Sequence, residues 1–145
     1  MNALEKVVDV LLCIGILFLM PLLYFDSQKG TLQAVLAGHT AEAFLDRISV
    51  EGEITIHGWA QLEEMLHGLG CRQYEIQREY YLYEPEEEGA VSEAVYRTEM
   101  EKLMETLELR GSIPFRKGDT LRLWIYCGDV PALYSTTIRA GGEGR

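Results

Sequence analysis

The residues of this chain that could bind a metal ion are scattered along it. Its three histidines lie in separate segments. His67 and Cys71 have the i, i+4 spacing of two ligands on one helix face, but Gly68 and Gly70 between them are typical of a helix end. We therefore expect a surface histidine and a core cysteine at these positions, and no metal site.

The local patterns that mark catalytic sites are also missing from the sequence. There is no glycine-rich phosphate loop, no nucleophile elbow and no Cys-x-x-Cys pair. Glutamates are numerous, yet their spacing singles out no acid/base pair. The acidic run at 86–89 is typical of a solvated loop, because it lacks the spaced ligands of a calcium loop. We expect a noncatalytic protein without a cofactor.

The charge balance excludes one large class of partners. The chain carries 23 acidic residues against 13 lysines and arginines, a formal net charge of −10. A surface of this sign repels the phosphates of nucleic acids and anionic lipid headgroups. We expect no nucleic-acid partner.

The cysteines leave two alternatives open. Cys13 lies in an apolar run, whereas Cys71 and Cys127 each lie beside a segment that is typical of a strand. A domain outside the cytoplasm would favour a Cys71–Cys127 disulfide, and a cytosolic domain would keep two buried thiols.

An apolar segment at 7–25, with Asp9 as its one charged residue, dominates the N-terminal part of the chain. Nineteen residues in a helix span roughly 28 Å, close to the thickness of the hydrocarbon core of a bilayer. A cleaved secretory signal is the alternative, but the run is long for one and the nearest Ala-x-Ala pattern is distant, at 41–43. We expect a transmembrane helix that contacts the lipid bilayer through 7–25.

The positive charges near the span do not decide its orientation, because Lys6 precedes it and Lys29 follows it. A short N-terminal arm is the easier end to leave in the cytoplasm, and a long C-terminal domain can be translocated whatever its charge. We expect a single-pass protein of the cell membrane, with the N-terminus cytoplasmic and the C-terminal domain extracytoplasmic.

Two acids, Glu5 and Asp9, stand at the start of the span. They are four residues apart and therefore lie on the same side of a helix. Asp9 either marks the true start of the span and reaches water at the headgroups, or meets a cation on a neighbouring subunit. We take both acids as candidate assembly contacts.

Beyond the span, the sequence predicts one α+β domain at 26–145. Apolar residues at helical spacing continue the anchor as an amphipathic helix over 26–49, and further helices are expected from Trp59 to Leu69 and over 90–112. Alternating segments at 74–83, 119–127 and 132–140 predict strands, with a short extended piece at 54–56. We expect the helices to pack on one face of a small antiparallel sheet of three to four strands.

The strand at 74–83 carries three clustered tyrosines, Tyr80, Tyr81 and Tyr83. Tyrosine offers a large contact area with a polar tip, which suits a binding surface. The alternative is that the tyrosines simply build a sheet with one face on the helices and the other exposed to solvent. The exposed face is a candidate contact in an assembly.

The order of these features resembles that of type IV pilin-like proteins and pseudopilins. An acid stands at position 5, the apolar helix is interrupted by Pro21, and an amphipathic continuation leads to a sheet. Residues 1 to 77 are also similar to minor pilin-like proteins of tight-adherence (Tad/Flp-type) pilus systems. The matching positions are Phe44, Leu45, Asp46, Gly52, Ile54, Thr55, Leu66, Tyr74 and Ile76.

The resemblance implies a membrane-anchored structural component of a pilus or secretion assembly in the bacterial cell envelope. It implies that Glu5 pairs with the N-terminal amine of a neighbour, in a homo- or hetero-oligomeric assembly with other subunits. No basic leader ending in glycine precedes the apolar run, so we expect that amine to be the one of Met1. The alternative function is an anchored binding or sensory module that recognises a peptide or small ligand.

Overall fold

The computed structural model describes residues 2–85, 91–128 and 131–140. The described residues form three helices and six strands. In chain order these are α1 (Ala3–Glu51), β1 (Glu53–Thr55), α2 (Ile56–Gly68), β2 (Gln73–Pro85), β3 (Val91–Thr98), α3 (Met100–Arg110), β4 (Ser112–Pro114), β5 (Thr120–Tyr126) and β6 (Pro131–Thr137). The acidic run at 86–89 lies outside the described residues.

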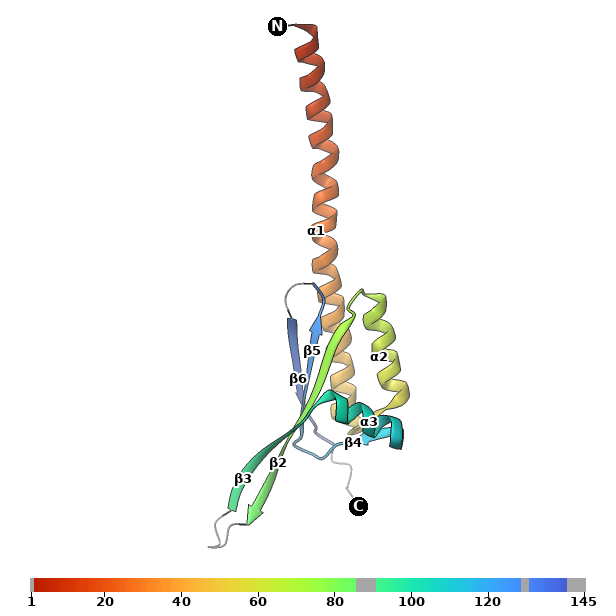
Figure 1. Cartoon of the computed structure of the whole chain (residues 1–145), viewed down its shortest axis with the longest axis vertical. Helices are drawn as coiled ribbons and strands as arrows, with labels where there is room; N and C mark the ends of the chain where they lie inside the picture. The colour runs from red at the N-terminus through yellow and green to blue at the C-terminus, as the bar shows by residue number, and fades with distance from the viewer. Residues whose placement is uncertain (1, 86–90, 129–130, 141–145) are drawn as a thin grey trace.

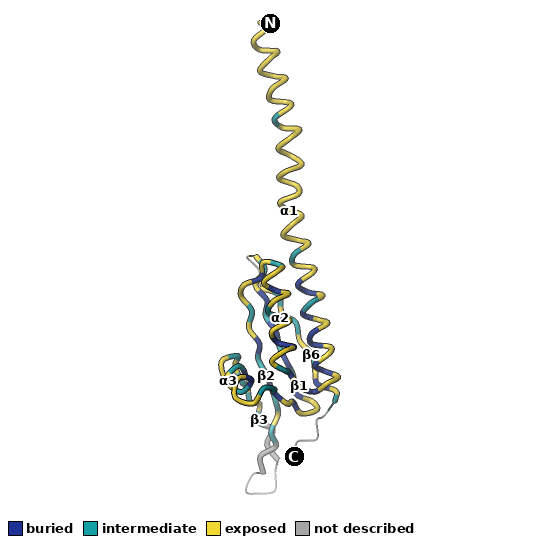
Figure 2. The backbone as a smooth tube through the Cα atoms, turned by 90° about the vertical axis from the view of Figure 1, so that its right-hand side faces the viewer, coloured by how far each residue is buried: buried dark blue, intermediate teal, exposed yellow. Residues whose placement is uncertain are grey.

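Helix α1 is one continuous helix of 49 residues with Pro21 inside it. Its N-terminal half projects away from the rest of the molecule, and buried positions begin only at Ala37 (Figures 1 and 2). The helix ends at Glu51, and the φ of 77° at the next residue, Gly52, lies in the left-handed region that glycine adopts without strain. The amphipathic continuation expected over 26–49 is thus part of the same helix.

The larger sheet is antiparallel, with strand order β3-β2-β5-β6. Strands β2 and β5 pair in a regular register that places Ile76 opposite Leu123, both fully buried. Burial along β5 alternates as expected, with Leu121, Leu123 and Ile125 buried and the residues between them more exposed. The predicted strands at 74–83, 119–127 and 132–140 are confirmed as β2, β5 and β6.

Buried residues of all three helices join those of β2 and β5 in one hydrophobic core. Helix α1 packs against β6 and α2. Gly38 permits the approach to β6, since a Cβ atom at this position would lie 2.7 Å from the Tyr134 hydroxyl oxygen. The α+β class with a small antiparallel sheet is confirmed.

The helix predicted over 90–112 is wrong in its first half. Residues Val91–Thr98 form strand β3, and the helix occupies only Met100–Arg110. Strand β3 pairs with β2 in a register that includes Tyr80 opposite Tyr96. Valine, tyrosine and threonine in this segment favour a strand, and pairing with β2 satisfies the backbone groups on the side that faces β2. A helix-like spacing of apolar residues could not reveal that neighbour.

A second, two-stranded sheet consists of β1 and β4. Its pairing joins Ile54 to Ile113, and both side chains are buried. Ile56, expected to end the extended piece, instead begins α2, where the Thr55 hydroxyl caps the helix by accepting from the Gly58 amide at 3.1 Å.

Candidate functional site

The projecting half of α1 is the first candidate surface. An 18-residue window of this helix has a mean hydropathy of 2.5 and none of it is buried, so the helix is long and apolar enough to cross a membrane. Glu5 and Asp9 are exposed on it, and no described residue makes an ion pair with either. Cys13, one turn further on, is an exposed free cysteine.

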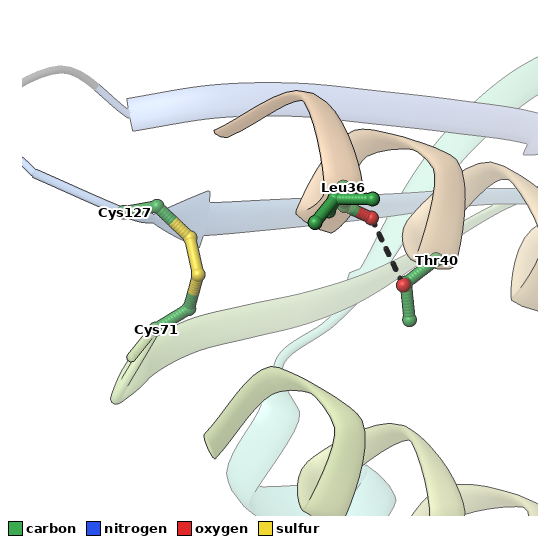
Figure 3. The surroundings of a disulfide bond; sticks show 4 residues. All are labelled: Leu36, Thr40, Cys71 and Cys127. Carbon is green, nitrogen blue, oxygen red and sulfur yellow. Dashed lines mark hydrogen bonds between the residues drawn. A yellow bond between two sulfur atoms is a disulfide. The ribbon is translucent and has the colours of Figure 1, made fainter. Parts of the chain in front are cut away.

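Cys71 and Cys127 form a disulfide in the structure. The bond links the residue after the end of β5 to the segment just before β2, across a sequence separation of 56 (Figure 3). Because Cys71 is bonded to another sulfur, it has no thiolate to offer as a metal ligand beside His67. Within the described part of the chain, no group of three or more metal-binding side chains comes together.

The second candidate surface is the hairpin arm, which we define as residues 80–85 and 91–96 of β2 and β3. It extends beyond the last pair between β2 and β5, which is Glu79 with Thr120. Figure 1 shows the arm at the end of the molecule opposite the N-terminus.

The structure separates the tyrosines of this arm. The Tyr80 ring stacks on that of Tyr96 with centroids 5.6 Å apart, whereas Tyr81 is 45% exposed. Side chains alternate between the two faces along β2, so Tyr81 lies on the solvent-facing side and its neighbour Tyr80 does not. The side chain of Tyr83 lies outside the described residues.

An ion pair holds the base of the arm. Arg78 donates to one carboxylate oxygen of Asp119 from Nε at 3.0 Å and from Nη2 at 2.6 Å. The same oxygen accepts from the Arg116 amide at 2.9 Å. The Arg78 guanidinium also lies over the rings of Tyr80 and Phe115, at 4.9 and 5.3 Å from their centroids. This ion pair was not predicted from the sequence, although an arginine on the buried side of a strand indicates that an acidic partner lies nearby.

A second ion-pair cluster lies at the next position of β2. Glu79 is 7% exposed, and one of its carboxylate oxygens lies 3.2 Å from Arg97 Nε and 3.4 Å from Arg122 Nη1. These arginines come from β3 and β5, the two strands that flank β2. The cluster therefore connects the three strands where the arm leaves the sheet.

A partly buried polar network joins α2 to β2. One carboxylate oxygen of Glu63 accepts from Trp59 Nε1 at 3.0 Å and from the Tyr74 hydroxyl at 2.7 Å. The ring of Trp59 packs edge-on against those of Phe44 and Tyr74. Burial, followed by the hydrogen bond to the Glu63 carboxylate, raises the pKa of Tyr74 to about 12.

This raised pKa predicts an alkaline loss of stability. The folded state binds the Tyr74 proton more tightly than the unfolded state, whose tyrosine pKa is about 10. The resulting stabilisation is complete below pH 10 and is lost as the pH rises towards the folded pKa of about 12. Glu63→Gln should lower the Tyr74 pKa, and absorbance titration of tyrosinate in the folded protein would measure it. Tyr81→Phe, a matched loss of one tyrosine, should leave this high-pH transition in place, and a Glu63→Gln titration identical to the wild type would contradict the assignment.

A groove of about 380 Å³ lies between α1 and α2. Apolar side chains such as Phe44 and Met65 line it together with Arg47 and Glu64, so it could hold an amphipathic group but assembles no catalytic pair. The residues that the structure brings together thus favour contact surfaces: an apolar helix, a projecting hairpin and a sheet joined by a disulfide.

Comparison with known proteins found no family model, no curated protein and no solved structure that matches this chain.

Proposed function

We propose that the protein is a noncatalytic, membrane-anchored, pilin-like structural subunit of a pilus or secretion assembly. One observation carries the proposal: α1 runs without a break from an exposed apolar half into the core of the α+β domain. Such a helix links the domain directly to whatever surrounds its apolar half. The resemblance of residues 1 to 77 to pilin-like proteins supports the same role.

The exposed apolar half requires partners from outside the described chain. The large apolar residues between Leu4 and Phe25 are exposed among the described residues, and Figure 2 shows this part of α1 coloured almost entirely as exposed. Lipid tails cover such a surface in a membrane, and the helices of neighbouring subunits cover it in an assembly. Glu5 and Asp9 supply the polar contacts that would align neighbouring helices in this role.

The proposed location is the cell membrane, with the N-terminus in the cytoplasm and the domain outside it. The Cys71–Cys127 disulfide supports this orientation, because disulfides persist in oxidising compartments and are rare in the cytosol. The short arm before the span is also the easier end to retain in the cytoplasm.

Cys13 provides a direct test of the proposed assembly. It is the one free thiol among the three cysteines and lies four residues after Asp9, on the same side of α1. Mild oxidation of native membranes should therefore join Cys13 to a neighbouring subunit, either another copy or a partner with a cysteine at the same depth. Glu5→Ala with Asp9→Ala should reduce the crosslinked product severalfold, since the acids set the register of the helices.

Cys13→Ser is the control that should abolish the product. A short thiol-to-amine crosslinker would extend the test to neighbours without a cysteine. If neither reagent yields a product in native membranes, and the double alanine variant leaves the oligomeric state unchanged, the structural role is wrong. A ligand-induced rise in melting temperature would then favour an anchored binding module, with the α1–α2 groove as its site.

A further inference from the structure

Strand β6 is an edge strand with unpaired backbone groups. The Ile138 amide donates to the Asp119 carbonyl at 2.8 Å, on the side of β5. Backbone groups of successive residues point to alternate sides of an antiparallel strand, so those of Leu133, Ser135 and Thr137 point away from β5. The Thr137 carbonyl does accept from the Ser49 hydroxyl of α1, at 2.9 Å. No described segment bonds to the backbone of Leu133 or Ser135 on that side.

A groove of about 350 Å³ lies along this free edge. Residues 133–136 of β6 form one side, and Glu42, Leu45 and Asp46 of α1 form the other. A strand added to a sheet lies about 4.8 Å from its neighbour. The groove borders residues 133–136, so a strand added at this spacing beside Leu133 and Ser135 would lie next to Glu42 and Asp46.

The charge of the groove is negative and unbalanced. Glu42 and Asp46 are exposed, lie four residues apart on one side of α1, and have no ion-pair partner among the described residues. Strand β6 contains no charged residue, and its register with β5 has no bulge. Natural edge strands are commonly protected by lysines, prolines or bulges, and β6 has only Pro131 at its first position.

We propose that β6 accepts a strand from a different protein, with lysine or arginine side chains that face Glu42 and Asp46. The free backbone groups of Leu133 and Ser135 provide main-chain hydrogen bonds, and the two carboxylates select a basic segment. Pairing with the β6 strand of a second copy does not fit, because that strand offers no basic residue and each copy carries a net charge of −10. The other edge strand, β3, offers only Arg97, which already pairs with Glu79. The inference concerns the α+β domain alone and does not depend on the proposed assembly role.

Binding of a short labelled peptide, in which lysine alternates with valine, tests the charge requirement. Fluorescence anisotropy with the full-length protein in neutral detergent should show saturable binding. Glu42→Gln with Asp46→Asn should weaken this binding at least about tenfold. Glu101→Gln with Glu105→Gln, a matched exposed pair four residues apart on α3, should leave it unchanged. Equal losses in both double variants would overturn the proposal in favour of nonspecific attraction by an acidic protein.

N-methylated versions of the same peptide test the strand pairing without altering the protein. Methyl groups on one set of alternate amides should abolish binding, because those amides face β6, and methyl groups on the other set should preserve it. Equal binding of the two methylated peptides would overturn the proposal. A dimer found by sedimentation in the same detergent, with no competition by the peptide, would instead assign this edge to a second copy.

Discussion

Replacing Cys71 and Cys127 together by alanine should lower the free energy of unfolding by about 2–4 kcal/mol. The disulfide closes a long loop, with a sequence separation of 56, and so restricts the unfolded chain. Cys71 is also fully buried in the core, so its loss removes packing as well as the crosslink. Unfolding followed by Trp59 and Trp124 fluorescence in mild detergent would measure the change.

Cys13→Ala is the matched control, because it removes a cysteine from the exposed half of α1 and should leave the stability of the domain unchanged. Alkylation of intact cells before lysis would show whether Cys71 and Cys127 are bonded or free in the cell. An extracytoplasmic domain predicts that Cys71 and Cys127 resist the reagent until they are reduced. Rapid alkylation of both, without loss of stability in the double alanine variant, would contradict the structural role of the bond and the proposed orientation.

Asp119→Ala should destabilise the domain by about 2–4 kcal/mol, because it leaves the Arg78 guanidinium largely buried without its anion. The Arg78 side chain is 19% exposed and that of Asp119 6%, so water replaces the lost carboxylate only in part. The Arg116 amide loses its acceptor in the same change. Since Arg78 pairs in the sheet with both β3 and β5, hydrogen exchange should rise first in the hairpin arm.

Two variants separate this effect from a general sensitivity to charge. Arg97→Ala breaks an ion pair whose arginine side chain is 60% exposed, and it should cost less than about 1 kcal/mol. Arg78→Leu combined with Asp119→Ala should be less destabilising than Asp119→Ala alone, because no unpaired buried charge remains. If Asp119→Ala proved as mild as Arg97→Ala, the buried pair would not hold the base of the arm.

Comparison of sequence and structure separates features with local causes from features with distant ones. The apolar helix over 7–25, its continuation over 26–49 and the alternation in β5 each depend on residues within a few positions of one another. Hydrophobic periodicity within such a window reports which face is buried. These features were predictable, and so was the α+β class that follows from their order.

Strand β3 shows where this local reasoning ends. Its apolar residues fit a sloping helical face when read alone, yet β2 offers a partner strand across the hairpin and the segment pairs with it. The candidate sites depend on residues that lie even further apart in the sequence. Arg78 and Asp119 are separated by 41 residues, and the two cysteines of the disulfide by 56.

The sequence by itself determined that this chain has an apolar helix long enough to cross a membrane, joined to an acidic α+β domain. Only the tertiary structure decided that β3 is a strand, that Cys71 bonds Cys127, and that the groove beside β6 carries two acids with no ion-pair partner in the described part of the chain. The physical reason is that the spacing of apolar residues, which predicts the buried side of a helix or strand, is a property of residues close together in the sequence. Pairing, charge compensation and free edges depend instead on which distant segments the fold places side by side.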